Sequence, residues 1–285
     1  MGGAFAGDVA LKSVIVNGFT LFNNGVLYLE GSGITSIGSN AFSEAPITDL
    51  KIPSSITFSK YSFEGTTTFK SVEYSSTTWL PIAKNTELVN LKVSGVSYIK
   101  DGILDKTDAD ITTISARTFE NIGITEAIVT SQVKSVGVGV FANNQKLKKV
   151  TIETVPPDFP QALFENNPVL SSITVGKYPI LSGGVLDLTS IVSGRIIVYS
   201  FSKLPAITKI ILPSSSVTFV GAAFASNSNL NSVVFPAGSS QLVLSEDLFY
   251  NNPKLSCLTF EEPTECSAFS DFRTVFGDKT LTKYT

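Results

Sequence analysis

The sequence contains no histidine. Histidine is the usual general base near neutral pH, a member of the Ser-His-Asp and Cys-His nucleophile systems, and the commonest metal-binding side chain. Its absence excludes those hydrolase mechanisms and the usual zinc centres. The sequence also has no phosphate-binding loop of the Gly-x-x-x-x-Gly-Lys-Ser/Thr type and no EF-hand loop. We therefore expect no enzyme activity, no cofactor and no metal.

Cysteine is almost absent as well. Cys257 and Cys266 are the two cysteines of the chain and stand nine residues apart near the C-terminus. They fit either a disulfide that ties down the end of the chain or two unrelated small residues, and two cysteines cannot complete a four-cysteine zinc site. By themselves they indicate no cellular compartment.

The chain also lacks a large excess of charge of one sign and lacks long apolar runs. The 21 basic and 24 acidic residues are interspersed, so no basic stripe is available to neutralise the phosphates of a nucleic acid. No stretch approaches the 18 apolar residues of a membrane span, and residues 1–8 lack the features of a signal peptide. We expect no nucleic-acid partner and no membrane insertion. The chain is either cytosolic or has lost a leader.

Phenylalanine recurs instead, about every 20 to 25 residues, and apolar residues follow it six, nine and eleven positions later. Phe141, for example, leads to Leu147, Val150 and Ile152. The other phenylalanines with this pattern are Phe63, Phe164, Phe201, Phe224 and Phe249, while Phe42 and Phe119 fit after deletion of one residue. A short period that carries Leu-x-x-Leu-x-Leu predicts a stacked solenoid of the leucine-rich-repeat kind.

A longer period overlies the first. Similar Gly-Val-Leu or Gly-Ile-Leu segments at residues 25–29, 102–106 and 184–188 each begin 17 residues before Phe42, Phe119 or Phe201. We predict an N-terminal cap over residues 1–24, one solenoid over 25–262 in three blocks of about three coils starting near 25, 102 and 184, and a C-terminal cap over 263–285. In the first block Ile82 takes a phenylalanine position. The three segments themselves are either cut-down coils or small hairpins.

Within each coil the Leu-x-x-Leu-x-Leu stretch alternates apolar and polar residues, which predicts a short strand. A second apolar cluster precedes several of the phenylalanines, as Ile34 and Ile37 precede Phe42. The fold class we expect is mainly β: a right-handed leucine-rich-repeat coil with a parallel β-sheet, and short second strands or turns on the opposite wall.

The best copies of the repeat resemble a known family. Residues 34–42, Ile-Thr-Ser-Ile-Gly-Ser-Asn-Ala-Phe, and the Leu-Lys-Ile-Pro at 50–53 resemble the BspA-like class of leucine-rich repeats, over roughly residues 25 to 260. That family often has cysteine three residues after the phenylalanine. Proteins of the class are common on bacterial surfaces and in some protists, and some bind host matrix proteins, so the resemblance implies a secreted or surface binding protein. This chain has asparagine at the cysteine position, namely Asn144, Asn167, Asn227 and Asn252.

Alternation places the residues eight, ten and twelve positions after each phenylalanine on the outward face of the sheet. This face is either a binding strip or simply a solvated surface, and it lacks the aromatic residues that favour interface hot spots. Candidate binding residues on it are Lys51, Glu73, Lys92, Lys149, Thr151, Glu153 and Lys209.

Calcium prefers oxygen ligands, so the repeated asparagines and a cluster of acidic residues each allow a calcium interpretation. Asparagine, however, favours turns and bonds backbone groups there, and the acidic cluster fits a solvated loop. We therefore favour structural roles for both groups. Trp79, just ahead of Ile82, is expected to repack its coil rather than to stack on a sugar. The acidic cluster consists of Asp101, Asp105, Asp108 and Asp110.

Together these features predict a noncatalytic recognition or adhesion protein, extracellular or at the cell surface, that binds a host or matrix protein or a glycan across several coils. One alternative is a parallel β-helix carbohydrate-active enzyme, which shares the coil length and the asparagine ladders but would gather its charged residues at one level of the stack. The other is a structural spacer within a larger surface protein. The ligand and the oligomeric state stay open.

Overall fold

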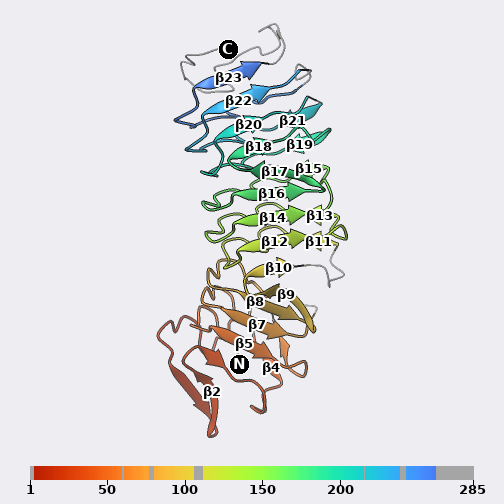
Figure 1. Cartoon of the computed structure of the whole chain (residues 1–285). Helices are drawn as coiled ribbons and strands as arrows, with labels where there is room; N and C mark the ends of the chain where they lie inside the picture. Colours follow the sequence, from red (N-terminus) through yellow and green to blue (C-terminus); the bar gives the residue numbers. More distant parts are fainter. Residues whose placement is uncertain are drawn as a thin grey trace. The chain divides into compact units, whose positions relative to one another are not determined.

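The computed structural model describes residues 3–59, 61–76, 80–105, 112–214, 216–237 and 242–260. These residues form strands and turns without any helix, so this part of the chain offers no helix that could cross a bilayer. The chain divides into two compact units: Met1–Ala109 with Asn121–Thr125 (unit 1), and Asp110–Glu120 with Glu126–Thr285 (unit 2). Each unit is a β-solenoid with a largely parallel sheet, which confirms the predicted fold (Figure 1).

The main sheet of unit 1 follows the chain order. Its strands are β1 (Ser13–Val16), β2 (Phe19–Asn23), β3 (Val26–Leu27), β5 (Asp49–Ile52), β7 (Ser71–Tyr74), β8 (Asn90–Val93), β9 (Val96–Lys100) and β10 (Ile103–Asp105). Strands β3, β5, β7 and β8 pair in parallel. On the other wall, β4 (Ser36–Ile37) pairs in parallel with β6 (Thr57–Phe58), which confirms the second strand predicted before Phe42.

Unit 2 repeats this plan with more coils. Its main sheet contains β12 (Glu126–Val129), β14 (Lys149–Ile152), β16 (Ser172–Val175), β17 (Tyr178–Ser182), β18 (Val185–Asp187), β20 (Lys209–Ile211), β22 (Ser232–Phe235) and β23 (Cys257–Phe260). The second wall carries two separate sheets (Figure 1). One pairs β11 (Thr113–Ile114) with β13 (Ser135–Val136), and the other joins β15 (Asp158–Phe159), β19 (Gly194–Ile196) and β21 (Val217–Phe219).

The recurring phenylalanines form the core of each unit as stacked rings. In unit 2 the ring centroids of Phe119, Phe141 and Phe164 are 6.4 Å apart from one to the next, at interplanar angles of 13° and 7°. The stack continues through Phe201, Phe224 and Phe249, at centroid distances of 5.4, 6.1 and 5.4 Å. All six side chains are fully buried. Since a buried aromatic ring removes 150–250 Å² from water, these rings dominate the packing of the coils.

The stack of unit 1 begins earlier than the sequence pattern indicated. The Phe5 ring lies 5.3 Å from the Phe42 ring, and the Phe5 N–H donates to the carbonyl of Ala41 at 2.9 Å. Leu11 and Val14 follow Phe5 at the repeat offsets of six and nine. The coil pattern thus extends into the segment for which the sequence predicts a cap. The cap and block boundaries stay predictions, and residues 263–285 lie outside the described part of the chain.

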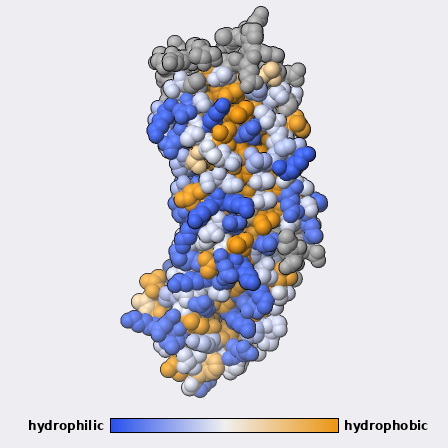
Figure 2. Space-filling model, in the orientation of Figure 1, coloured by the Kyte–Doolittle hydropathy of each residue, from blue (hydrophilic) through white to orange (hydrophobic). Residues whose placement is uncertain are grey.

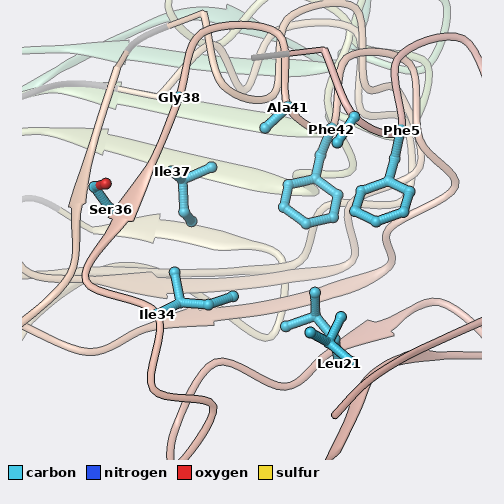
Figure 3. A pocket seen from close by; sticks show the side chains of 10 residues that line it. Phe5, Leu21, Ile34, Ser36, Ile37, Gly38, Ala41 and Phe42 are labelled. Atoms are coloured by element: carbon cyan, nitrogen blue, oxygen red, sulfur yellow. The ribbon is translucent and has the colours of Figure 1, made fainter. Parts of the chain in front are cut away.

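A small apolar pocket lies beside the first coil of unit 1. Figure 3 shows the Phe5 and Phe42 rings side by side, with Leu21, Ile34 and Ile37 around the same space. Its volume is about 50 Å³. Ligand pockets usually enclose several hundred cubic ångströms. This space is therefore a packing gap and not a candidate ligand site.

The turns that carry the phenylalanines are hydrogen-bonded from coil to coil. In unit 2 the Phe141 N–H donates to the Leu163 carbonyl at 3.2 Å, and the Asn143 N–H donates to the Glu165 carbonyl at 2.8 Å. Asn143 adopts a φ of 64°. The Ala142 N–H, which lies between these two donors, bonds the Gly139 carbonyl within the turn at 3.1 Å. Alternate N–H groups of the turn therefore face the following coil.

The Gly-Val-Leu and Gly-Ile-Leu segments are the returning strands of hairpins, which decides between the two alternatives left open by the sequence. Strands β9 and β17 run antiparallel to the strand before them, and β10 and β18 return. Strands β1, β2 and β3 repeat this arrangement. Two reversals restore the strand direction, so the next coil continues in parallel. Most of the two-residue turns have positive φ at both positions, as in type I′ hairpins: Asn17-Gly18, Asn24-Gly25, Ser94-Gly95, Asp101-Gly102 and Gly183-Gly184.

Candidate functional site

The outward face of the unit 1 sheet carries a row of charged side chains. The parallel register sets Lys51 beside Glu73, and Glu73 beside Lys92. Lys92 Nζ lies 3.3 Å from Glu73 Oε1, with 46% and 42% of the two side chains exposed. The structure therefore brings these three predicted residues together in one line across three coils, with alternating charge.

In unit 2 the first coils carry a comparable row. Lys149 stands between Glu126 and Ser172 in the register, and its Nζ lies 3.5 Å from Glu126 Oε2. Thr151 is half-buried in the next row of the same strand. Glu153 is exposed beyond the strand end, and its carboxylate accepts the N–H of Ser131 at 2.8 Å. Three of the predicted residues thus share one coil.

The later coils of unit 2 are more apolar on this face (Figure 2). Lys209 is half-buried between Val185 and Ser232 in the register. In the next row Ile211 pairs with Val234. The alternation predicted an exposed Val234, but its side chain is only 6% exposed. The neighbouring β-branched side chains of the row cover it, because cross-strand neighbours lie about 5 Å apart.

Sequence reasoning missed Glu126 and Ile128, the members of these rows that belong to β12. Both side chains are half-buried on the outward face, and Glu126 is the ion-pair partner of Lys149. The signal was present, since Ala127 and Val129 fit the inward positions of a coil that is one residue shorter. Strict alternation from those two residues would have assigned Glu126 and Ile128 to the face.

The repeated asparagines serve the backbone, in agreement with the structural role favoured from the sequence. Asn167 Nδ2 donates to the Phe141 and Phe164 carbonyls at 2.9 and 2.8 Å, and its Oδ1 accepts the Asn144 N–H at 2.8 Å. Asn227 and Asn252 make the same type of bonds. Each amide joins two successive coils, so its oxygen and nitrogen are already engaged.

The remaining candidates do not form a site in the described residues. Asp101 and Asp105 are described while Asp108 and Asp110 lie outside, and no group of three or more carboxylate or cysteine side chains gathers among the residues described. Trp79 and Cys266 lie outside the described residues, so the interpretations of Trp79 and of the cysteine pair stay predictions.

Tyr74 is the buried titratable side chain of unit 1 with the clearest perturbation. Burial raises the pKa of its phenol from 10.0 to about 12, although the Leu80 N–H, which donates to its oxygen at 3.3 Å, acts in the opposite direction. The ring packs edge-on against Phe58 at 5.6 Å. Because Tyr74 points into the core, this perturbation belongs to packing and not to a reactive site.

A comparison with known proteins identifies the family of these repeats. The sequence profile of the BspA type leucine rich repeat region, in 6 copies, matches residues 27–106, 94–180 and 194–274. The chain belongs to this family. As a BspA-type repeat protein it has asparagine amides bonding its coils at the position where the family often carries cysteine. No curated protein sequence matches the chain.

Two solved structures are similar to this BspA-type protein. One is a leucine rich cell surface protein from Faecalibacterium prausnitzii A2-165, with a TM-score of 0.39 and 15% identity over 87% of this chain and 55% of the other. The second is the pneumococcal vaccine antigen PcpA, with a TM-score of 0.41 and 16% identity over 90% of this chain and 55% of the other. The chain therefore spans about half the length of each of these proteins.

Proposed function

We propose that this BspA-type repeat protein is a noncatalytic recognition protein, secreted or exposed at the cell surface, that binds a protein or a glycan through the outward face of its sheets. Membership of the BspA-type family supports a surface role. The absence of histidine supports a noncatalytic role, because the common general base and nucleophile partner is missing.

The observation that carries the proposal is the alignment of outward side chains. Parallel register repeats them every 4.7–4.9 Å from coil to coil. Lys51, Glu73 and Lys92 form one such row. Half-exposed ion pairs of this kind contribute only about 0–1 kcal/mol to folding. Their charges can therefore exchange partners with a ligand at little cost to the fold, and the rigid ladder requires little ordering on association.

The test is a matched pair of triple variants measured against an array of matrix proteins and glycans. The face variant is Lys51→Ala/Glu73→Ala/Lys92→Ala, which removes the charged row of unit 1. The control is Lys203→Ala/Glu165→Ala/Lys254→Ala, which removes the same charges from turn residues, including the 2.7 Å ion pair between Lys203 and Glu165. We expect the face variant to lose about ten-fold or more in affinity and the control to bind like the wild type.

Equal binding by the face variant and the wild type would locate the site elsewhere. Turnover of a polysaccharide by the purified chain would replace the proposal with the carbohydrate-active enzyme. Binding of a longer parent protein through a different region alone would favour the spacer.

A further inference from the structure

The second wall of unit 2 is interrupted at one step. Strands β11 and β13 pair with each other, and β15, β19 and β21 pair in a separate sheet. Strands β13 and β15 belong to successive coils, yet no strand pairing joins them. The main sheet continues across the same step, because β14 pairs with β16 over four residues.

Two prolines explain the interruption. Coil-to-coil bonding on this wall uses the N–H groups seven and four positions before the phenylalanine. Lys134 donates to the Thr112 carbonyl at 2.7 Å, and Gly137 donates to the Ile114 carbonyl at 2.8 Å. At the same two distances before Phe164 the residues are prolines, which have no N–H. These residues are Pro157 and Pro160.

The ladder is intact on both sides of this step. Ile197, four positions before Phe201, donates to the Phe159 carbonyl at 3.2 Å. The flanking steps are also tight: a Cβ on Gly137 would clash with the Ala116 nitrogen, and a Cβ on Gly194 would clash with the Pro157 oxygen. Backbone hydrogen bonds thus join the coils of this wall before β13 and after β15, but not between β13 and β15.

A cleft of about 490 Å³ occupies this opening. Its apolar lining includes Val129, Val133 and Ile152, which are 1%, 6% and 4% exposed. Polar groups, among them Lys134 and Asp158, also line it. The volume falls within the range of about 300–1,000 Å³ that is typical of ligand sites.

The cleft borders an open strand edge. In β13, the bond from Gly137 to Ile114 shows which residues face β11, and the backbone groups of Val136 point to the other side. Among the described residues no backbone N–H donates to the Val136 carbonyl. A short edge strand with an available N–H and C=O is a template for a further strand.

We propose that this cleft binds an extended apolar peptide segment of a partner protein, which adds as a strand to the edge of β13. Main-chain hydrogen bonds would replace those that Pro157 and Pro160 cannot make, and alternate apolar side chains would enter the space lined by Val129, Val133 and Ile152. Among the described residues no aromatic side chain lines the cleft, so it offers no platform for stacking a sugar. Both charged groups of the lining are engaged: Asp158 pairs with Arg195 at 3.2 Å, and Lys134 Nζ donates to the Ser131 carbonyl at 2.7 Å.

The probes are fluorescein-labelled peptides in which valine, leucine or isoleucine alternates with threonine, each made with and without N-methyl groups at alternate residues. N-methylation removes the peptide donors and leaves the side chains in place. We expect saturable binding of the unmodified peptides and a loss of about ten-fold or more on N-methylation, the equivalent of one to two hydrogen bonds.

Two variants locate the site. Pro157→Ala/Pro160→Ala restores both ladder donors, so the coil can close onto β13 and peptide binding is expected to disappear. Pro168→Ala is the matched control, because Pro168 is exposed in the same coil and lies neither at a ladder position nor in the cleft lining, and it should bind like the wild type. Val155→Trp fills the rim of the cleft from a side chain that is 46% exposed, and it should abolish binding without altering the ladder.

The proposal is independent of the outward face, since the variant Lys51→Ala/Glu73→Ala/Lys92→Ala should leave peptide binding unchanged. Equal affinity for the N-methylated peptides would mean an apolar ligand site without strand addition and would overturn the proposal. So would failure of every peptide to bind, or unchanged binding in both the double proline variant and Val155→Trp. Self-association of the chain that the peptides do not displace, measured by sedimentation, would identify a second copy as the occupant instead.

Discussion

Units 1 and 2 repeat the same coil but differ in how many of their coils carry a bridging asparagine. Three positions after the phenylalanine, unit 2 has asparagine in four coils, and each amide bonds two successive turns. In unit 1 the coil of Ile82 has Asn85 at this position, which donates to the Thr66 and Ile82 carbonyls and accepts the Phe69 N–H. The first two predicted coils of unit 1 have Ala45 and Thr66 there instead. Thr66 makes one such bond, from its hydroxyl to the Phe42 carbonyl at 3.3 Å. Coil stacking therefore tolerates the loss of the asparagine while the ring stack is kept.

The aromatic core shows a similar contrast. Unit 2 keeps a phenylalanine in each of its stacked turns, whereas unit 1 has Ile82 at the corresponding position of one coil. The preceding coil carries two buried aromatic side chains at its inward positions: Phe69 lies 6.3 Å from Phe63, and Tyr74 packs on Phe58. The repeat thus accepts a buried aliphatic side chain in place of a phenylalanine.

The largest loss of stability should come from removing the stacked phenylalanine rings, which both units contain. Phe63→Ala in unit 1 and Phe164→Ala in unit 2 each remove a fully buried ring from the stack. Each should lower the free energy of unfolding by about 3–5 kcal/mol through lost burial and the cavity left behind. Denaturant unfolding measures this, with Phe→Leu at both positions as the milder control. A much smaller loss for Phe63→Ala would show that unit 1 does not depend on its ring stack.

Asparagine and threonine at this repeat position should contribute differently to stability. Asn167→Ala removes the acceptor of the Asn144 N–H and the donor to two buried carbonyls, so it should cost about 3 kcal/mol. Thr66→Ala removes one bond and should cost about 1 kcal/mol. Hydrogen exchange at the Asn144 amide reports the change locally. Equal costs for the two variants would mean that the asparagine amides add nothing beyond a single hydroxyl bond.

A pH-dependent effect tests the buried tyrosine of unit 1. Burial raises the pKa of Tyr74 to about 12, so the folded state holds the phenol proton more tightly than the unfolded chain, whose pKa is near 10. Stability should therefore be complete below pH 10 and fall as the pH rises from 10 to 12, by up to about 1.4 kcal/mol per pH unit. Tyr74→Phe should remove this dependence. An unchanged slope in the variant would assign the effect to other groups.

The sequence predicted the features that depend on period alone. Phenylalanine spacing and apolar alternation predicted the ring stacks, the parallel strands and most outward positions. The first strands of the hairpins were missed, although Asn17-Gly18 and Asp101-Gly102 are strong hairpin signals when read as turns. Burial of Val234 depends on the side chains of neighbouring coils, which no single coil reveals. The cleft was missed because Pro157 and Pro160 acquire meaning only once the ladder donors are known.

The hydrogen-bonded turns give each stack of coils a net dipole along the stacking direction. Within a turn such as the one at Phe141, alternate peptide groups point their N–H towards the next coil and their C=O towards the previous one. Peptide dipoles aligned in this way add along the column, as they do along a helix axis. The side of the turns that faces later coils is therefore partly positive, and the side that faces earlier coils is partly negative. A carboxylate or phosphate that meets the turn column will accordingly distinguish between its two ends.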